Sequence, residues 1–267
     1  MKAIFLDVDG TLVPFGERLP PESAIQAIQK ARKAGHRVYI NTGRCRQEVG
    51  KELENIGFDG IICSNSLYVE EDGKCLFQKD MDKELVKEIS DFFEEEKIGY
   101  FLEGQKSVKA SKLFFEHVSA LFGSEASQKF KTGFPSIMEA RITYDDVAKI
   151  NFLPKEDTIK KLKIRFEKKC QINSWSLLGS DRGMGEVTLK EASKASGVKL
   201  IMKRHGLKKE DTYAFGDSLG DLSMIEFSGT GVAMGNSEQI LKDYSDYVTS
   251  SIENDGILRA FENFNLL

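Results

Sequence analysis

The first sixty residues alternate between short apolar runs and longer amphipathic stretches. The apolar runs over residues 3–6, 37–40 and 60–63 predict strands, and the stretches over 22–33 and 47–55 predict helices. Strands that are apolar along their whole length are typical of a parallel sheet with helices on both faces. The pattern therefore predicts the start of a doubly wound, Rossmann-like α/β domain.

The same alternation returns towards the C-terminus. There the pattern predicts, in chain order, a helix over 192–205, a strand over 212–215, a helix over 219–227, a strand over 231–234 and a helix over 256–264. We interpret the two ends of the chain, 1–80 and 186–267, as two parts of one core domain.

The middle of the chain, residues 81–185, follows another pattern. Before it, the Asp72-Gly73 pair lies between two β-type runs and predicts a hairpin over 68–77. We then predict, in chain order, helix 82–97, strand 100–102, helix 112–122, an irregular connector over 122–142, strand 147–153, helix 157–168 and strand 170–177. This order indicates a second α/β domain inserted into the core, which a chain of 267 residues can accommodate.

Composition and charge exclude several classes of protein. Hydrophobic residues make up 40% of the chain, and no run of them exceeds four residues, so we expect a cytoplasmic protein with no signal peptide and no membrane contact. The 38 basic and 42 acidic residues give a net charge of −4 without a basic stripe, so nucleic acid is not an expected partner. The four cysteines are widely spaced and are expected to be free thiols. Nothing in the pattern implies a protein partner.

Two carboxylates follow the first predicted strand in the segment Asp7-Val8-Asp9-Gly10-Thr11-Leu12. The C-terminal end of a central parallel strand faces the crevice where doubly wound sheets bind ligands. Both carboxylates can serve one site if the chain turns after Asp7, which Gly10 makes easy. One of them can then attack phosphorus while the other moves protons. The alternative is a polar turn between strand and helix.

Two further polar segments follow other predicted strands. In Asn41-Thr42-Gly43-Arg44, the Thr42 hydroxyl and the next backbone N–H groups can hold a phosphoryl oxygen, although such a segment is also a common helix-entry turn. In Gly216-Asp217-Ser218-Leu219-Gly220-Asp221, two carboxylates four residues apart are suited to Mg²⁺. A helix-capping carboxylate is the alternative there.

Together these segments resemble the motifs of the haloacid dehalogenase-like (HAD) superfamily of phosphohydrolases. The resemblance makes Lys194 the lysine of the third motif, because it precedes Asp217 by 23 residues; Lys190 and Lys199 are the nearby competitors. The large insertion and the segments 232–237 and 254–257 are similar to the Cof-like branch of sugar phosphatases. In that branch an inserted α/β cap closes over the active site and selects the leaving group.

The resemblance implies a mechanism and a set of site residues. Asp7 would be the nucleophile that forms an aspartyl-phosphate, and Asp9 would protonate the leaving oxygen and then activate water. Thr42 and Lys194 would complete the catalytic set by holding phosphoryl oxygens. The implied Mg²⁺ ligands are Asp7, Asp9 through its main-chain carbonyl, Asp217 and Asp221, and the implied substrate-binding residues are Gly43, Arg44 and Asn236. The alternatives are a residue that hydrogen-bonds a loop for Asn236 and a solvated cation for Arg44.

Two positions depart from the family pattern. Gly220 stands where many members have Asn, which would loosen the metal-binding loop, and Ser66 stands where Gly commonly follows Asn65, which would alter the nearby turn. The primary hypothesis is a Mg²⁺-dependent phosphatase acting on small phosphate monoesters, with sugar phosphates as the expected substrates. The alternatives are a phosphosugar mutase on the same scaffold, which would yield an isomerised sugar phosphate, and a non-catalytic regulatory protein, which would show no turnover.

Overall fold

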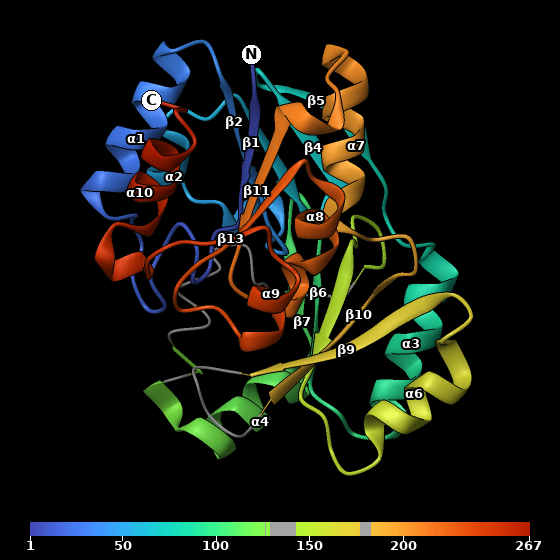
Figure 1. Ribbon diagram of the computed structural model, residues 1–267. Coiled ribbons are helices and arrows are strands. Elements are labelled where there is room, and N and C mark those ends of the chain that lie inside the picture. The colour runs from blue at the N-terminus through green and yellow to red at the C-terminus, as the bar shows by residue number, and fades with distance from the viewer. Residues whose placement is uncertain (126, 129–142, 177–182) are drawn as a thin grey trace. The chain divides into compact units, whose positions relative to one another are not determined.

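The computed structural model describes residues 1–125, 127–128, 143–176 and 183–267 (Figure 1). The chain divides into two compact units. Unit 1 comprises Met1–Arg44, Val49–Gln78 and Ser193–Leu267, and unit 2 comprises Cys45–Glu48 and Lys79–Ala192. Unit 2 therefore extends beyond the expected insertion of 81–185 at both ends and also includes four residues that directly follow Arg44.

Unit 1 is built on an eight-stranded sheet with the strand order β13-β12-β11-β1-β2-β3-β4-β5. The central strand β1 pairs in parallel with β2 on one side and β11 on the other, whereas β4 and β5 form an antiparallel edge. The strands are β1 (Ala3–Leu6), β2 (Arg37–Asn41), β3 (Gly60–Cys63), β4 (Tyr68–Glu71), β5 (Lys74–Gln78), β11 (Thr212–Gly216), β12 (Thr230–Ala233) and β13 (Tyr247–Val248).

Helices cover both faces of this sheet, as Figure 1 shows for α1 and α10 on one side and α7 and α8 on the other. Alternate residues of β1 point to opposite faces, so Ile4 and Leu6 enter one apolar core while Ala3 and Phe5 enter the other. The helices are α1 (Glu22–Lys33), α2 (Lys51–Glu54), α7 (Lys194–His205), α8 (Leu222–Phe227), α9 (Gln239–Asp243) and α10 (Gly256–Asn263). The predicted doubly wound core is confirmed.

Unit 2 contains a five-stranded antiparallel sheet with the order β7-β6-β8-β10-β9. Helix α3 packs on the sheet through Phe93, which is stacked on Phe152, and contacts α6 through Phe92, whose ring meets that of Phe166 edge-on. The elements are α3 (Lys83–Glu95), β6 (Tyr100–Glu103), β7 (Val108–Ala110), α4 (Lys112–Phe122), β8 (Lys149–Phe152), α6 (Thr158–Phe166), β9 (Cys170–Ser176) and β10 (Gly183–Leu189).

Several predicted elements differ from those observed. The helix expected over 47–55 is a 3-10 turn at Arg46–Glu48 followed by the short α2, with Gly50 between them. Strand β10 was not predicted, because its glycines interrupt the apolar pattern; a side chain at Gly185 would collide with the Phe152 ring. The connector expected over 122–142 lies largely outside the described residues. Within the described part of the chain, every helix is too short or too polar to cross a bilayer.

Candidate active site

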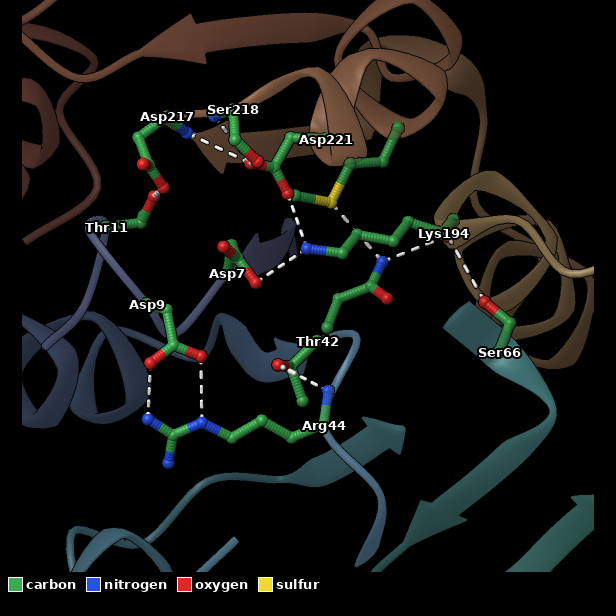
Figure 2. Close-up of polar contacts among 12 residues, drawn as sticks. Asp7, Asp9, Thr11, Thr42, Arg44, Ser66, Lys194, Asp217, Ser218 and Asp221 are labelled. Carbon is green, nitrogen blue, oxygen red and sulfur yellow. Dashed lines mark hydrogen bonds and ion pairs between the residues drawn. The ribbon is translucent and has the colours of Figure 1, made fainter. Parts of the chain in front are cut away.

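Three central parallel strands of unit 1 end at one edge of the sheet, and each is followed by a polar residue. Asp7 follows β1, Thr42 follows β2 and Asp217 follows β11. Hydrogen bonds between neighbouring strands extend one residue past the ends of β1 and β2. The amide of Asp7 donates to Phe215 O, and the amide of Thr42 donates to Ile62 O. Figure 2 shows that the three side chains are gathered in one place.

The ammonium of Lys194, in the first turn of α7, lies between two carboxylates. Its Nζ donates to Asp7 Oδ1 at 2.6 Å and to Asp221 Oδ1 at 2.5 Å, and all three side chains are buried (Figure 2). The competing lysines lie elsewhere: Lys190 donates to a backbone oxygen of unit 2, and Lys199 lies over the Phe227 ring. The structure therefore brings Lys194, and neither competitor, to the carboxylates.

Asp221 holds the loop that carries Asp217. Its Oδ2 accepts hydrogen bonds from the amides of Asp217 (3.0 Å) and Ser218 (3.1 Å) and from the Ser218 hydroxyl (3.3 Å). A side chain at Gly216 would collide with Asp221, so glycine is required there. These three hydrogen bonds involve only Asp217, Ser218 and Asp221, so they do not require a side chain at Gly220. This geometry gives no sign of the loosening expected from Gly220.

The carboxylates of Asp7, Asp217 and Asp221 form a cluster in which one oxygen from each lies within 4.8 Å of the other two. Such an all-oxygen donor set fits a hard divalent cation. Burial raises the pKa of Asp7 to about 8, with the Asp221 charge adding to the shift and Lys194 opposing it. Burial, again with Asp221, raises the pKa of Asp217 to about 7. The cluster therefore carries more negative charge than its buried surroundings favour, and a divalent cation would offset it.

Lys194 and Thr11 supply the polar contacts that partly offset this charge. Burial disfavours the Lys194 ammonium, but the Asp221 and Asp7 carboxylates outweigh it and raise the Lys194 pKa above its ordinary value. The Thr11 hydroxyl donates to Asp217 Oδ1 at 2.9 Å. Gly10 has a φ of +80°, and a side chain there would collide with the Asp217 carboxylate. Glycine at this position thus lets the two loops approach.

Asp9 lies in different surroundings from Asp7. Its side chain is 47% exposed and forms a two-point ion pair with Arg44, whose Nε donates to Oδ2 at 2.8 Å and whose Nη2 donates to Oδ1 at 2.5 Å (Figure 2). The Thr42 hydroxyl accepts a hydrogen bond from the Arg44 amide at 3.2 Å. Asp9, the predicted proton-transfer residue, is thus paired with Arg44, one of the predicted substrate-binding residues, in this structure.

The remaining predicted substrate-binding residues are Asn236 and Gly43. The Asn236 amide connects two loops, since Nδ2 donates to Gly10 O at 2.7 Å and Oδ1 accepts from the Ile252 amide at 3.0 Å. These contacts give Asn236 a role in holding the loop after β1. At Gly43, a Cβ would make only an ordinary contact with Asn65, at 3.6 Å from its Oδ1, so packing does not demand glycine there.

Some residues that support the site were not predicted. Asn41 donates from Nδ2 to the backbone oxygen of Lys194 at 3.0 Å, and the Ser66 hydroxyl lies against the same oxygen. Thr11 and Ser218 lie inside predicted motifs, but only the structure shows their contacts. The partners of Asn41 and Ser66 are more than one hundred residues away along the chain, so no local pattern could indicate them.

Comparison with known proteins identifies the family. A family model described as haloacid dehalogenase-like hydrolase matches residues 4–261. The chain belongs to this family. Among solved structures, the HAD subclass IIB sugar phosphatase BT4131 superimposes with a TM-score of 0.81 and 27% identity, covering 100% of both chains. A protein of Geobacillus kaustophilus HTA426 gives a TM-score of 0.86 at 25% identity and covers 100% of this chain and 99% of its own.

Sequence relatives of this HAD-like hydrolase agree with that assignment. YkrA of Bacillus subtilis (strain 168), named as a candidate phosphatase, is 30% identical over 266 residues, which cover 100% of this chain and 98% of YkrA. Phosphoglycolate phosphatase of Methanobrevibacter smithii is 28% identical over 265 residues, covering 99% and 98% respectively. The protein is a phosphoric monoester hydrolase of the HAD family. Phosphatases of this family generally use a metal ion, and the cluster described above is where this chain could hold one.

Proposed function

We propose that this protein hydrolyses small phosphate monoesters, with sugar phosphates as the substrate class, in a Mg²⁺-dependent reaction through an aspartyl-phosphate. The observation that carries the proposal is the buried Lys194 ammonium between Asp7 and Asp221, at the end of the central strands. The likeness to a sugar phosphatase over the full chain supports the substrate class.

The residues present fit a magnesium ion. The carboxylates of Asp7, Asp217 and Asp221 would hold it, together with the main-chain carbonyl of Asp9. When bound, the ion supplies positive charge that lets an anionic nucleophile and an anionic phosphate approach each other. The raised pKa values of Asp7 and Asp217 support this assignment, because burial and the Asp221 charge disfavour both ionised carboxylates despite the nearby Lys194, and a divalent cation would offset this penalty.

In the first step, an Asp7 carboxylate oxygen bonds to phosphorus while the bond from phosphorus to the substrate's alcohol oxygen breaks. Asp9 donates the proton that the departing oxygen takes. Lys194 and the Thr42 hydroxyl hold the phosphoryl oxygens, on which negative charge is spread in the transition state. The products of this step are the free alcohol and phosphorylated Asp7.

In the second step, water attacks phosphorus and Asp9 takes a proton from it. The bond between phosphorus and Asp7 breaks, which releases inorganic phosphate and restores the Asp7 carboxylate. Because Arg44 holds the Asp9 carboxylate in this structure, we propose that an incoming phosphate dianion competes for the guanidinium and frees Asp9 for proton transfer. We further propose that unit 2 is the cap that selects the leaving group and excludes water.

A panel of phosphorylated metabolites tests the proposal. We expect the wild-type protein with Mg²⁺ to release inorganic phosphate from sugar phosphates, and EDTA to abolish this release. Asp7→Asn keeps the shape of the side chain but removes the nucleophile, so it should lower kcat by about ten thousand-fold or more. Asp243→Asn, on the exposed face of α9, is the matched control and should leave kcat unchanged. Wild-type turnover by Asp7→Asn would contradict the proposal.

A further inference from the structure

The first turn of α7, which carries Lys194, begins without a side-chain cap of its own. The preceding residue, Ser193, has extended backbone angles at the N-cap position but makes no capping hydrogen bond with its side chain. Its carbonyl oxygen accepts from the amide of Ser196, in the tighter 3-10 pattern. The next amide along, that of Gly197, donates instead to the hydroxyl of Ser66 at 2.8 Å.

Ser66 belongs to a turn with a costly backbone. Ser64, Asn65 and Ser66 all have positive φ angles, of 50°, 52° and 70°, a conformation that residues other than glycine rarely adopt. Backbone hydrogen bonds fix the turn on both sides, since the Asn65 amide donates to Thr42 O and the Asn65 carbonyl accepts from the Ser193 amide. Because the backbone at residue 66 suits glycine better than serine, the presence of Ser66 indicates that its hydroxyl group has a role.

The Ser66 hydroxyl contacts the backbone of Lys194 as well as that of Gly197. Its Oγ donates to Lys194 O at 3.4 Å, and Asn41 Nδ2 donates to the same oxygen at 3.0 Å. A Cβ at Gly197 would lie 2.8 Å from Ser66 Oγ and 2.6 Å from an Ile62 methyl group, so the close approach depends on glycine. The hydroxyl is buried and bridges two backbone groups of one helical turn.

We propose that Ser66 is a positioning residue that caps α7 from a separate loop and thereby sets where the Lys194 ammonium lies between Asp7 and Asp221. Lys194 is held at both ends: its carbonyl by Ser66 and Asn41, and its Nζ by the two carboxylates. A shift of the first turn would move the ammonium away from the phosphoryl position. The effect on turnover rests on the proposed phosphatase function, whereas the capping contact does not.

Two substitutions of Ser66 distinguish an effect on the position of Lys194 from an effect on the stability of the fold. Ser66→Ala removes the hydroxyl and keeps the strained backbone, and Ser66→Gly removes the hydroxyl and relieves the strain. We expect both to lower kcat about tenfold with little change in KM, while Ser66→Gly has the higher thermal midpoint of the two. The matched control is Ser228→Ala, because Ser228 has a buried hydroxyl for which the described residues provide no partner. It should keep the wild-type kcat.

A double-mutant cycle tests whether Ser66 acts through Lys194. In a Lys194→Ala background, adding Ser66→Ala should cause no further loss of kcat, because the group that Ser66 positions is gone. Multiplicative losses from the two substitutions would overturn the proposal, as would a wild-type kcat in both Ser66 variants.

Amide hydrogen exchange tests the contact without any substrate. We expect Ser66→Ala to speed exchange at the Gly197 amide about tenfold or more, while exchange in the middle of α7 stays unchanged. An unchanged rate at Gly197 would overturn the capping role. If the wild-type protein showed no turnover on any phosphate ester, the phosphatase proposal would fail instead, and the exchange rate at Gly197 would still decide whether Ser66 caps the helix.

Discussion

At the scale of single residues, two aspartates only two positions apart have different surroundings. Asp7 is buried beside Lys194, and Asp9 is half exposed beside Arg44. The sequence predicts that both carboxylates and Lys194 serve one site, because a strand end followed by Gly10 is a local signal and motif spacing selects the lysine, and the structure brings Lys194 to Asp7. The sequence could not predict the ion pair of Asp9 with Arg44, since the side chains meet only when two strands pair side by side.

Replacing Lys194 by Met tests the importance of its charge. Met keeps much of the length and apolar stem but removes the ammonium that faces Asp7 and Asp221. We expect kcat to fall by about one hundred- to one thousand-fold, the range typical for the loss of one preorganised electrostatic contact. Steady-state kinetics with Mg²⁺ would measure this loss. Lys199→Met is the control, because Lys199 lies over the Phe227 ring; equal activity of the two variants would refute the assignment.

At the scale of elements, loops after separate strands hold one another in place. Asn236, after β12, connects the loop at Gly10 with the amide of Ile252. The sequence predicts Asn236 close to Gly10, which is where the structure has it, but the motif left open whether its amide contacts substrate or holds a loop. The motif cannot decide, because an amide side chain can bind a ligand or two backbone groups, and only the neighbouring loops decide between these uses.

The variant Asn236→Ala distinguishes the two roles. Loss of two hydrogen bonds should lower the free energy of unfolding by about 2 kcal/mol, at about 1 kcal/mol for each bond. We expect KM to stay unchanged, because the amide is already occupied by backbone groups. Denaturant unfolding and steady-state kinetics are the two measurements. A raised KM at unchanged stability would instead support the substrate contact predicted from the sequence.

The other end of α7 is anchored by a buried carboxylate in β4. Glu71 accepts hydrogen bonds from the Tyr39 hydroxyl and from His205 and is paired with Arg204 and Arg37. Burial alone would raise the pKa of Glu71, but the hydrogen bonds from Tyr39, His205 and Arg204 outweigh burial and lower it below the ordinary 4.5. A carboxyl group whose pKa is lowered by folding stabilises the folded state at pH values above its ordinary pKa. This stabilisation is lost as the pH falls through the pKa that the group has in the folded state.

The variant Glu71→Gln should therefore change how stability depends on pH. At pH 7 we expect it to lower the free energy of unfolding by about 2 kcal/mol, because the charged partners lose their carboxylate. As the pH falls from 4.5 through the lower pKa of Glu71 in the folded state, the difference from the wild-type protein should shrink, because the wild-type carboxyl becomes protonated over this range. Thermal midpoints measured from pH 3 to pH 7 would check this, and a difference that is constant across the range would contradict it.

At the scale of the whole molecule, the chain forms two units, and the one that contains Asp7, Asp217 and Asp221 is assembled from distant segments. Hydrophobic alternation was sufficient to predict its parallel sheet, because apolar strands and amphipathic helices have different periods. It was not sufficient for the second unit, where β7 has only three residues and β10 contains Gly183 and Gly185. The association of 45–48 with the second unit also has no local signal.

The two units should respond differently to a cation. Mg²⁺ at one hundred times its dissociation constant should stabilise unit 1 by about 2.7 kcal/mol through binding to the folded state alone. Unit 2 contains none of the proposed ligands, so its unfolding should not shift. Calorimetry with and without Mg²⁺ would measure this, and Asp217→Asn should reduce the shift. An equal shift in that variant would show that Mg²⁺ acts elsewhere.

The most direct test of the central claim is a search for phosphate on Asp7. An aryl phosphate is the appropriate substrate, because its leaving group departs without a proton, whereas release of phosphate from the enzyme still needs Asp9. The Asp9→Asn variant, mixed with this substrate and Mg²⁺ and quenched in acid, should yield the peptide containing Asp7 with one added phosphoryl group by mass spectrometry. Aryl alcohol release by this variant without any phosphorylated Asp7 would contradict the proposed mechanism.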